Sequence, residues 1–181
     1  MSTNPITDSL RNRKSVRAFE DRQIPEDIKQ EILHCAAQAP TAGNQQLYTI
    51  LDITDQALKD KLAVTCDNQP FIAKAPLVLI FCADAGKWHD AYIEAGCGPR
   101  SPGAGDLMLA VCDAAIAAQS AVTAAVSFGI GSCYIGDIME QCETHRELLG
   151  LPAYVFPALM LVFGYPTQQQ ISREKPERFA M

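Results

Sequence analysis

Closely spaced cysteine pairs are missing from this sequence. Its seven cysteines are spread along the chain, and the closest two, Cys133 and Cys142, are nine positions apart. Zinc knuckles and dithiol redox centres need two thiols only a few residues apart. Reduced cysteines that behave as small hydrophobic residues account for such a spread. We therefore expect no metal site and a structural role for the cysteines.

Long apolar runs are missing as well. No stretch approaches the roughly 18 uninterrupted apolar residues that a membrane-spanning helix needs. The opening MSTNPITDSL lacks the basic region and apolar core of a secretory signal. The sequence therefore predicts a cytoplasmic protein without membrane contact. Its 181 residues, 48% hydrophobic and 20% charged, are typical of one globular domain over 1–181.

An excess of positive charge is also missing, since the formal net charge is −6 and the pI is about 5.0. This balance argues against a nucleic-acid partner, because nucleic-acid-binding domains are usually basic. Residues 11–17, RNRKSVR, are the exception, with four cations and no acid. This basic segment fits either a solvated helix end or a compact anion site. One phosphate needs only two or three donors, and the planar fork of arginine suits it.

An extended conformation of the basic segment would place Arg13, Ser15 and Arg17 on one face. Two cations and a hydroxyl on one face form a phosphate cradle. At ~4 Å, each cation–phosphate pair contributes on the order of 4 kcal/mol before desolvation costs. A second basic cluster follows the last expected strand: Arg173, Lys175 and Arg178. This cluster either folds back to join the first or forms a frayed tail of mixed charge.

Helical and strand patterns intermix without a strict repeat, which predicts an α+β fold with a sheet covered by helices. The expected helices cover 6–12, with Thr7 or Asp8 as N-cap, 25–39, 55–65, 87–95, 106–128 and 137–149. The expected strands cover 47–53, 76–84, 132–136 and 156–165. The continuous apolar run at 76–84 is typical of a central strand. Gly129 and Gly131 are expected to end the long helix before them.

Five segments, taken in order, resemble the FMN-dependent nitroreductase family over nearly the whole chain. They are RNRKSVRAFEDRQIPEDIKQEILHCAAQAPTAGNQQ at 11–46, NQPFIAKAPLVLIFCAD at 68–84, GDLMLAVCDAAIAAQ at 105–119, GIGSCYIGD at 129–137 and the terminal GYP…SREKP. The resemblance implies a three-layer α+β fold, with a central sheet flanked by helices, in an intertwined homodimer. It also implies one FMN per active site, built from both subunits. The implied activity is electron transfer from NAD(P)H to nitroaromatic, quinone or similar electron-poor acceptors by a ping-pong mechanism.

The resemblance also implies which residues bind the cofactor. Those at the phosphate and ribityl chain would be Arg13, Lys14 and Ser15, completed by Arg173 and Lys175. Arg17 would lie near N1 and O2 of the flavin ring and would stabilise the anionic reduced form. Asn68 would pair with the O2/N3 edge, and Gln69 is a neighbouring candidate. The segment near N5 would be Ile135, Gly136 and Asp137, and the partner subunit would supply Pro40, Thr41, Asn44 and Gln46. No catalytic side chain is expected, because the flavin carries the redox chemistry.

The chain departs from the family pattern in ways that leave its substrate open. Leu47 and Tyr48 follow Gln46 where relatives often have Pro-Trp, and Asp137 stands where many have a second glycine. Other interpretations are reductive dehalogenation or flavin destruction on the same scaffold, a flavin-binding sensor without turnover, and an anion-binding module without flavin. Trp88 and Tyr92, one helical turn apart, form either a lid over the flavin or an ordinary hydrophobic pair.

Overall fold

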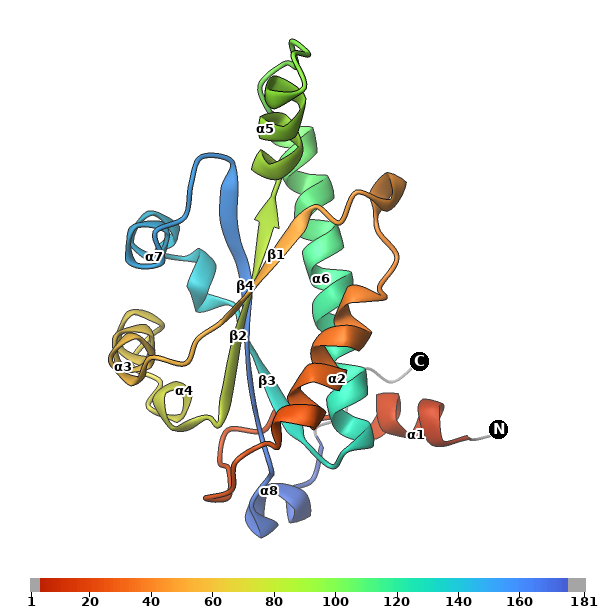
Figure 1. The fold of residues 1–181 in the computed structure, drawn as a ribbon. Coiled ribbons are helices and arrows are strands. Elements are labelled where there is room, and N and C mark those ends of the chain that lie inside the picture. Colours follow the sequence, from red (N-terminus) through yellow and green to blue (C-terminus); the bar gives the residue numbers. More distant parts are fainter. Residues whose placement is uncertain (1–3, 176–181) are drawn as a thin grey trace.

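An antiparallel sheet of four strands, in the order β1–β2–β4–β3, forms the centre of the protein. The structure is a computed structural model that describes residues 4–175 (Figure 1). The strands are β1 (Tyr48–Asp52), β2 (Leu77–Asp84), β3 (Gly131–Ile135) and β4 (Val155–Gly164). The α-helices are α1 (Pro5–Asn12), α2 (Glu26–Ala37), α3 (Gln56–Thr65), α4 (Phe71–Lys74), α5 (Gly86–Glu94), α6 (Ala104–Ser127), α7 (Cys142–Leu148) and α8 (Gln168–Ser172). Two short 3-10 helices are η1 (Ala42–Asn44) and η2 (Asp137–Met139).

Helices cover both faces of this sheet, which confirms the three-layer α+β prediction. Helices α2 and α6 pack on one face, and α3, α4 and α7 lie on the other (Figure 1). All eight residues of β2 are buried, as expected for a central strand. Leu79 and Phe81 face the α2–α6 layer, whereas Val78 and Ile80 face the opposite layer. This alternation follows from the two-residue period of a strand.

Helix α6 combines a buried face with an exposed one. Small side chains line the buried face, which packs against the sheet and α2: Ala110, Ala114, Ala117, Ala118, Ala121 and Ala125. Large apolar side chains are exposed along the same helix: Leu107, Met108, Leu109 and Ile116. Within residues 4–175, α6 is the one helix long and apolar enough to cross a membrane, by length and composition only. Its packing against the sheet is that of a core helix in a globular protein.

Several element boundaries differ from the sequence predictions for local reasons. Asn4, not Thr7 or Asp8, caps α1, because its side chain accepts hydrogen bonds from the backbone N–H groups of Ile6 and Thr7. Thr7 instead completes a reciprocal capping box with Asn4. The predicted helix 137–149 is two elements, η2 and α7, because Gln141 adopts φ −115° and ψ 50°, outside the helical region. Helices α4 and α8 and the 3-10 helix η1 were not predicted from the sequence.

Candidate functional site

The basic segment lies beside β3. The backbone N–H of Val16 donates to the carbonyl of Ser132 at 2.9 Å, and Ser15 forms a parallel bridge with Ser132. Val16 is buried, whereas Arg17 is exposed and Ser15 is partly exposed. Ser15 and Arg17 therefore point away from the core at the positions that an extended chain predicts.

The half-buried side chain of Arg13, whose Nε and Nη2 atoms are shielded from water, is the main electrostatic feature of this region. Its carbon Cζ lies 5.5 Å from the centroid of the Tyr134 ring, a cation–π distance. Within residues 4–175, three buried side-chain polar atoms have no hydrogen-bond partner: Nε and Nη2 of Arg13 and Oγ of Ser132. Buried polar atoms are almost always paired, so unpaired atoms on Arg13, which lies beside Tyr134, and on Ser132, two positions before Tyr134, indicate a place for an external ligand. Two of the three are donors of a cation, which suits an anionic ligand.

Cations from both ends of the chain meet beside the basic segment. Arg173 donates from Nη2 to the carbonyl of Ser15, and Lys14 donates to the carbonyls of Ile171 and Arg173. Lys175 donates to the carbonyl of Arg11. The structure thus brings Arg173 and Lys175 to the basic segment, while Arg178 lies outside the described residues.

Five cations gathered here lack acidic partners in the part of the chain that the structure describes. Over residues 4–175, the ion pairs involve other cations, and the following form none: Arg13, Lys14, Arg17, Arg173 and Lys175. The site is therefore positive although the whole chain is acidic. Burial raises the pKa of the nearby Tyr134 phenol above its ordinary value, and the positive charge of Arg13 partly offsets this increase.

The residues expected at the flavin ring lie on three segments that contact one another. The side-chain amide of Gln69 donates to Asp137 Oδ2 at 3.1 Å and to the carbonyl of Cys66 at 2.9 Å. Arg17 Cζ lies 6.0 Å from the centroid of the Phe71 ring. Segment 68–71 is thereby connected both to the end of β3 and to the basic segment.

The predicted ring-edge residues differ in exposure. Ile135 is buried at the end of β3, whereas Gly136 is exposed and Asp137 is partly exposed. Asn68 is exposed in a turn at φ 51°, and its side chain forms no hydrogen bond within residues 4–175. Its side chain therefore does not satisfy the turn backbone and remains available to a ligand.

The remaining predicted residues, Pro40, Thr41, Asn44 and Gln46, lie elsewhere in the chain. They belong to the loop around η1, which stands beside the first half of α6, whereas α1 lies near the far end of α6 (Figure 1). The amide of Gln46 donates to the carbonyl and to Oδ1 of Asn44, at 2.6 and 2.7 Å. One chain therefore does not bring this loop to Arg13.

The sequence prediction missed Ser132 and Tyr134 and assigned no role to Phe71. Ser132 and Tyr134 are two positions apart on β3, so both point to the same face of the strand. Tyr134 donates from its hydroxyl to Gln119 Oε1 at 3.3 Å, which connects the site to α6. Phe71 lies in α4, beside Arg17. The alternation along β3 is the one sequence signal that could have indicated Ser132 and Tyr134 together.

The thiols and acidic groups show no metal-binding arrangement. All seven cysteines are free, and no group of three or more His, Cys, Asp or Glu side chains within residues 4–175 could hold a metal ion. Burial raises the pKa of Cys66 and Cys82 to about 12, and nearby carboxylates add to the effect. These two thiols are therefore protonated and unreactive near neutral pH.

A sequence profile described as "Nitroreductase family" matches residues 10–165. The chain belongs to the nitroreductase family. It is 32% identical over 180 residues to an FMN reductase [NAD(P)H] of Bacillus subtilis, covering 96% of this chain and 70% of that protein. It is 33% identical to an oxygen-insensitive NADPH nitroreductase of Salmonella typhimurium, covering 90% of this chain and 66% of that protein.

Solved structures of this family share the fold. The B. megaterium protein NfrA2 superposes with a TM-score of 0.90 at 32% identity, covering 97% of this chain and 71% of that one. NfrA1 nitroreductase from B. subtilis superposes with a TM-score of 0.89 at 30% identity, covering 95% and 70%. The predicted family and its three-layer fold are both confirmed. These relatives are longer than the present chain, which spans about seven tenths of their length.

Proposed function

We propose that this nitroreductase-family protein is an FMN-dependent oxidoreductase that passes electrons from NAD(P)H to nitroaromatic, quinone or similar electron-poor acceptors by a ping-pong mechanism. The observation that carries the proposal is the set of unpartnered buried atoms on Arg13 and Ser132, beside cations from both chain ends. Relatives named FMN reductase, NADPH nitroreductase and Cr(VI) reductase support the same activity.

The donor set at Arg13 fits the phosphate of FMN. Arg13 would bind a phosphate oxygen through Nε and Nη2, and Ser132 would add a hydroxyl. Arg173, Lys14 and Lys175 already donate to backbone carbonyls, so they would hold the two chain ends together and supply positive potential. When bound, FMN accepts a hydride from the nicotinamide and releases the electrons to the acceptor.

Other side chains would orient the flavin ring and tune its reduction. Arg17 would place positive charge near N1 and O2, where negative charge develops on reduction. Asn68 would bind the O2/N3 edge, with Gln69 beside it. Gln69 also holds Asp137 through the 3.1 Å hydrogen bond, so the segment of Ile135, Gly136 and Asp137 would be fixed near N5.

The second subunit of a homodimer would complete the site with Pro40, Thr41, Asn44 and Gln46. The exposed apolar face of α6 supports such a dimer, because large apolar patches usually mark interfaces. An open hollow of about 700 Å³ lies on this face, lined by Cys35, Ile116 and Gln119 among others. Gln119 also accepts the Tyr134 hydroxyl, so the proposed interface adjoins the proposed phosphate site. The free cysteines are compatible with a cytoplasmic location.

The visible spectrum of the purified protein, followed by anaerobic titration with NADH and NADPH, tests this function. We expect one FMN per chain, bleaching by a reduced nicotinamide, and reoxidation by a quinone or nitroaromatic compound. Bound flavin that is never reduced would contradict the proposal and favour a sensor. Protein that stays colourless after incubation with FMN would favour an anion-binding module. Reoxidation only by halogenated aromatics, with halide release, would favour reductive dehalogenation.

A further inference from the structure

Loop 40–47 is held on the α6 side by one buried carboxylate, that of Asp113. Asp113 is 2% exposed and lies among the alanines of α6. Its Oδ1 accepts the backbone N–H of Ala42 at 2.9 Å, and its Oδ2 accepts that of Leu47 at 3.2 Å. A single side chain therefore holds both ends of the loop. A buried carboxylate needs such donors, which explains an acid on an otherwise apolar helix face.

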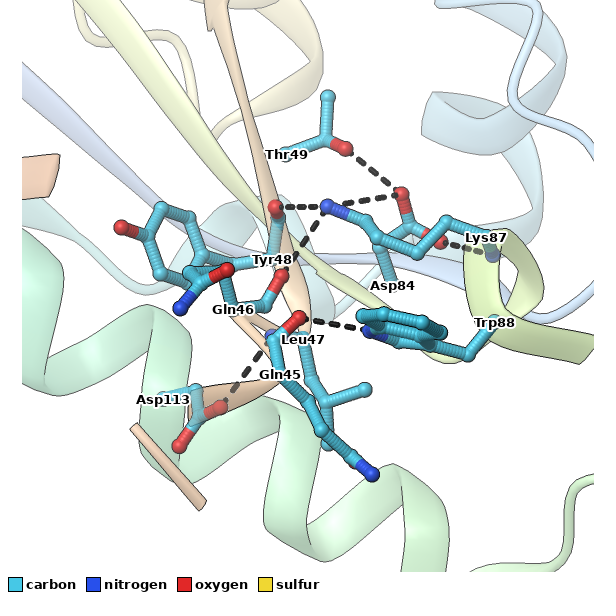
Figure 2. Close-up of polar contacts among 9 residues, drawn as sticks. All are labelled: Gln45, Gln46, Leu47, Tyr48, Thr49, Asp84, Lys87, Trp88 and Asp113. Carbon is cyan, nitrogen blue, oxygen red and sulfur yellow. Dashed lines mark hydrogen bonds and ion pairs between the residues drawn. The ribbon is translucent and has the colours of Figure 1, made fainter. Parts of the chain in front are cut away.

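Two consecutive residues of α5 anchor the same loop from the other side (Figure 2). Lys87 Nζ donates to the carbonyls of Gln46, at 3.0 Å, and Tyr48, at 2.6 Å. Trp88 Nε1 donates to the carbonyl of Gln45 at 2.7 Å. Two side chains of one helix thus bind three backbone carbonyls, two in the loop and one at the start of β1.

Asp84, at the end of β2, holds the start of α5 so that Lys87 and Trp88 reach the loop. Its Oδ1 accepts the backbone N–H of Lys87 at 3.1 Å, and its Oδ2 accepts the Thr49 hydroxyl at 2.6 Å (Figure 2). The Lys87 ammonium lies 3.8 Å from the same Oδ2. Because Asp84 is itself 7% exposed, these contacts are largely shielded from water.

The anchored loop contains two residues in the left-handed region. Asn44 has φ 55° and Gln46 has φ 47°, a conformation that costs free energy for a side chain other than glycine. Such conformations persist when the surrounding contacts hold them, and they concentrate at functional sites. Here the anchors surround Gln46 closely: Lys87 binds its carbonyl, and its amide binds Asn44.

We propose that Asp113, Lys87 and Trp88 are positioning residues of the flavin site. They hold Asn44 and Gln46 in the conformation in which loop 40–47 contacts the FMN of the partner subunit. This inference rests on the function proposed above. A preordered loop binds more tightly because its ordering entropy is not lost on binding. Trp88, whose ring centroid lies 6.0 Å from that of Tyr92, then acts as a loop anchor and not as a lid.

Single substitutions on α5 test the proposal on the full-length protein. Trp88→Phe keeps an aromatic ring but removes the N–H donor together with the five-membered ring, and Lys87→Met removes both ammonium hydrogen bonds and the ion pair to Asp84. Lys61→Met is the matched control, because Lys61 is exposed on α3 and its ammonium forms no hydrogen bond or ion pair within residues 4–175. We expect each α5 variant to raise the dissociation constant of FMN about tenfold, the effect of losing one or two hydrogen bonds. The thermal midpoint of flavin-free Trp88→Phe should change little, and Lys87→Arg, which keeps the charge beside Asp84, should restore most of the affinity.

Trp88 also gives a direct readout of the loop, because it is the single tryptophan of the chain. In Asp113→Asn, one of the two loop N–H groups loses its acceptor, so the loop should loosen. The Trp88 emission of the flavin-free protein should then shift to the red, whereas in Lys61→Met it should stay unchanged.

Three outcomes would decide whether the positioning role holds. Weaker FMN binding by the α5 variants, with an unchanged thermal midpoint in Trp88→Phe and a shifted Trp88 emission in Asp113→Asn, supports the positioning role. Wild-type affinity in both Trp88→Phe and Lys87→Met overturns the positioning role and leaves the proposed function intact. No flavin binding by the wild-type protein overturns the proposed function, and the positioning role with it.

Discussion

Val16 lies so close to Gly131 that a Cβ atom built on Gly131 would be 2.5 Å from Val16 Cγ2. The absence of a side chain at Gly131 is what lets the basic segment approach β3. We predict that Gly131→Ala displaces this segment, lowers the free energy of unfolding by about 1–3 kcal/mol through overpacking, and weakens FMN binding. Urea unfolding and a flavin titration measure both effects.

Gly98→Ala is the control for this substitution. A Cβ at Gly98 would meet no atom within 4 Å, and its φ is not positive. The control should therefore unfold and bind flavin like the wild-type protein. Equal stability and equal affinity in Gly131→Ala would contradict the role given to the contact between Val16 and Gly131.

Arg17 should affect the reduction potential of the flavin. Its side chain is exposed beside Phe71 and forms no ion pair within residues 4–175, so its charge is free to act on the reduced flavin. We expect Arg17→Ala to weaken FMN and to lower its midpoint potential, by about 30 mV for a tenfold loss of preference for the reduced form. Arg17→Lys, which keeps the charge, should shift the potential less. A spectroelectrochemical titration in which the flavin-loaded Ala variant keeps the wild-type potential would remove Arg17 from this role.

The exposed face of α6 should determine the oligomeric state. Ile116→Glu places a charge in the proposed interface, where an unpaired buried charge costs about 3 kcal/mol or more. We predict that size-exclusion chromatography with light scattering shows a monomer and that flavin binding is lost with the dimer. Val64→Glu, at an exposed position of α3 in the opposite layer, should remain dimeric. A dimeric Ile116→Glu variant would place the interface elsewhere.

Asp106 should make the free energy of unfolding depend on pH in the acid range. Both of its oxygens accept hydrogen bonds from Arg100, at 2.6 and 2.9 Å, and Oδ2 also accepts the N–H of Gly103 at the start of α6. The Arg100 hydrogen bonds, followed by that of Gly103, lower the pKa of Asp106 from 3.8 to about 2. Because the folded pKa is depressed, the stabilisation is complete above the unfolded pKa and is lost as the pH falls from about 4 to about 2.

The Asp106→Asn variant measures this contribution. Over the acid range between the two pKa values, its free energy of unfolding should fall less steeply than that of the wild type. At neutral pH the difference between the two proteins should be constant. If the free energies of unfolding of the two proteins fell in parallel throughout the acid range, Asp106 would have the same pKa in the folded and unfolded states.

The sequence predicted those features that depend on local pattern. The continuous apolar run of β2 indicated a central strand, and all eight of its residues are buried. Helices α4 and α8 are four and five residues long, too short for a helical period to appear. For α1, Asn4, Thr7 and Asp8 are all good capping residues, so composition alone could not choose among them.

The site was harder to predict where it depends on tertiary contacts. The basic segment and the C-terminal cations are visible as charge clusters, but charge alone left their meeting open, and only the family resemblance implied it. Gly131 was read as part of a helix stop, whereas its role is the close approach of Val16, a segment more than 100 positions away. Asp113 could not be assigned to loop 40–47, because nothing local to α6 identifies the N–H groups that it accepts. The predicted flavin-binding roles of the individual residues stay predictions.

The central claim is that Arg13 binds the phosphate of FMN, and a comparison of FMN with riboflavin tests it most directly. Riboflavin has the same ring and ribityl chain without the phosphate. The account predicts that the wild-type protein binds FMN far more tightly than riboflavin. In Arg13→Ala, the dissociation constant of FMN should rise about a hundredfold, the effect of two charge-assisted hydrogen bonds, while that of riboflavin changes little. An Arg13→Ala variant that keeps the wild-type ratio of the two dissociation constants would contradict the claim.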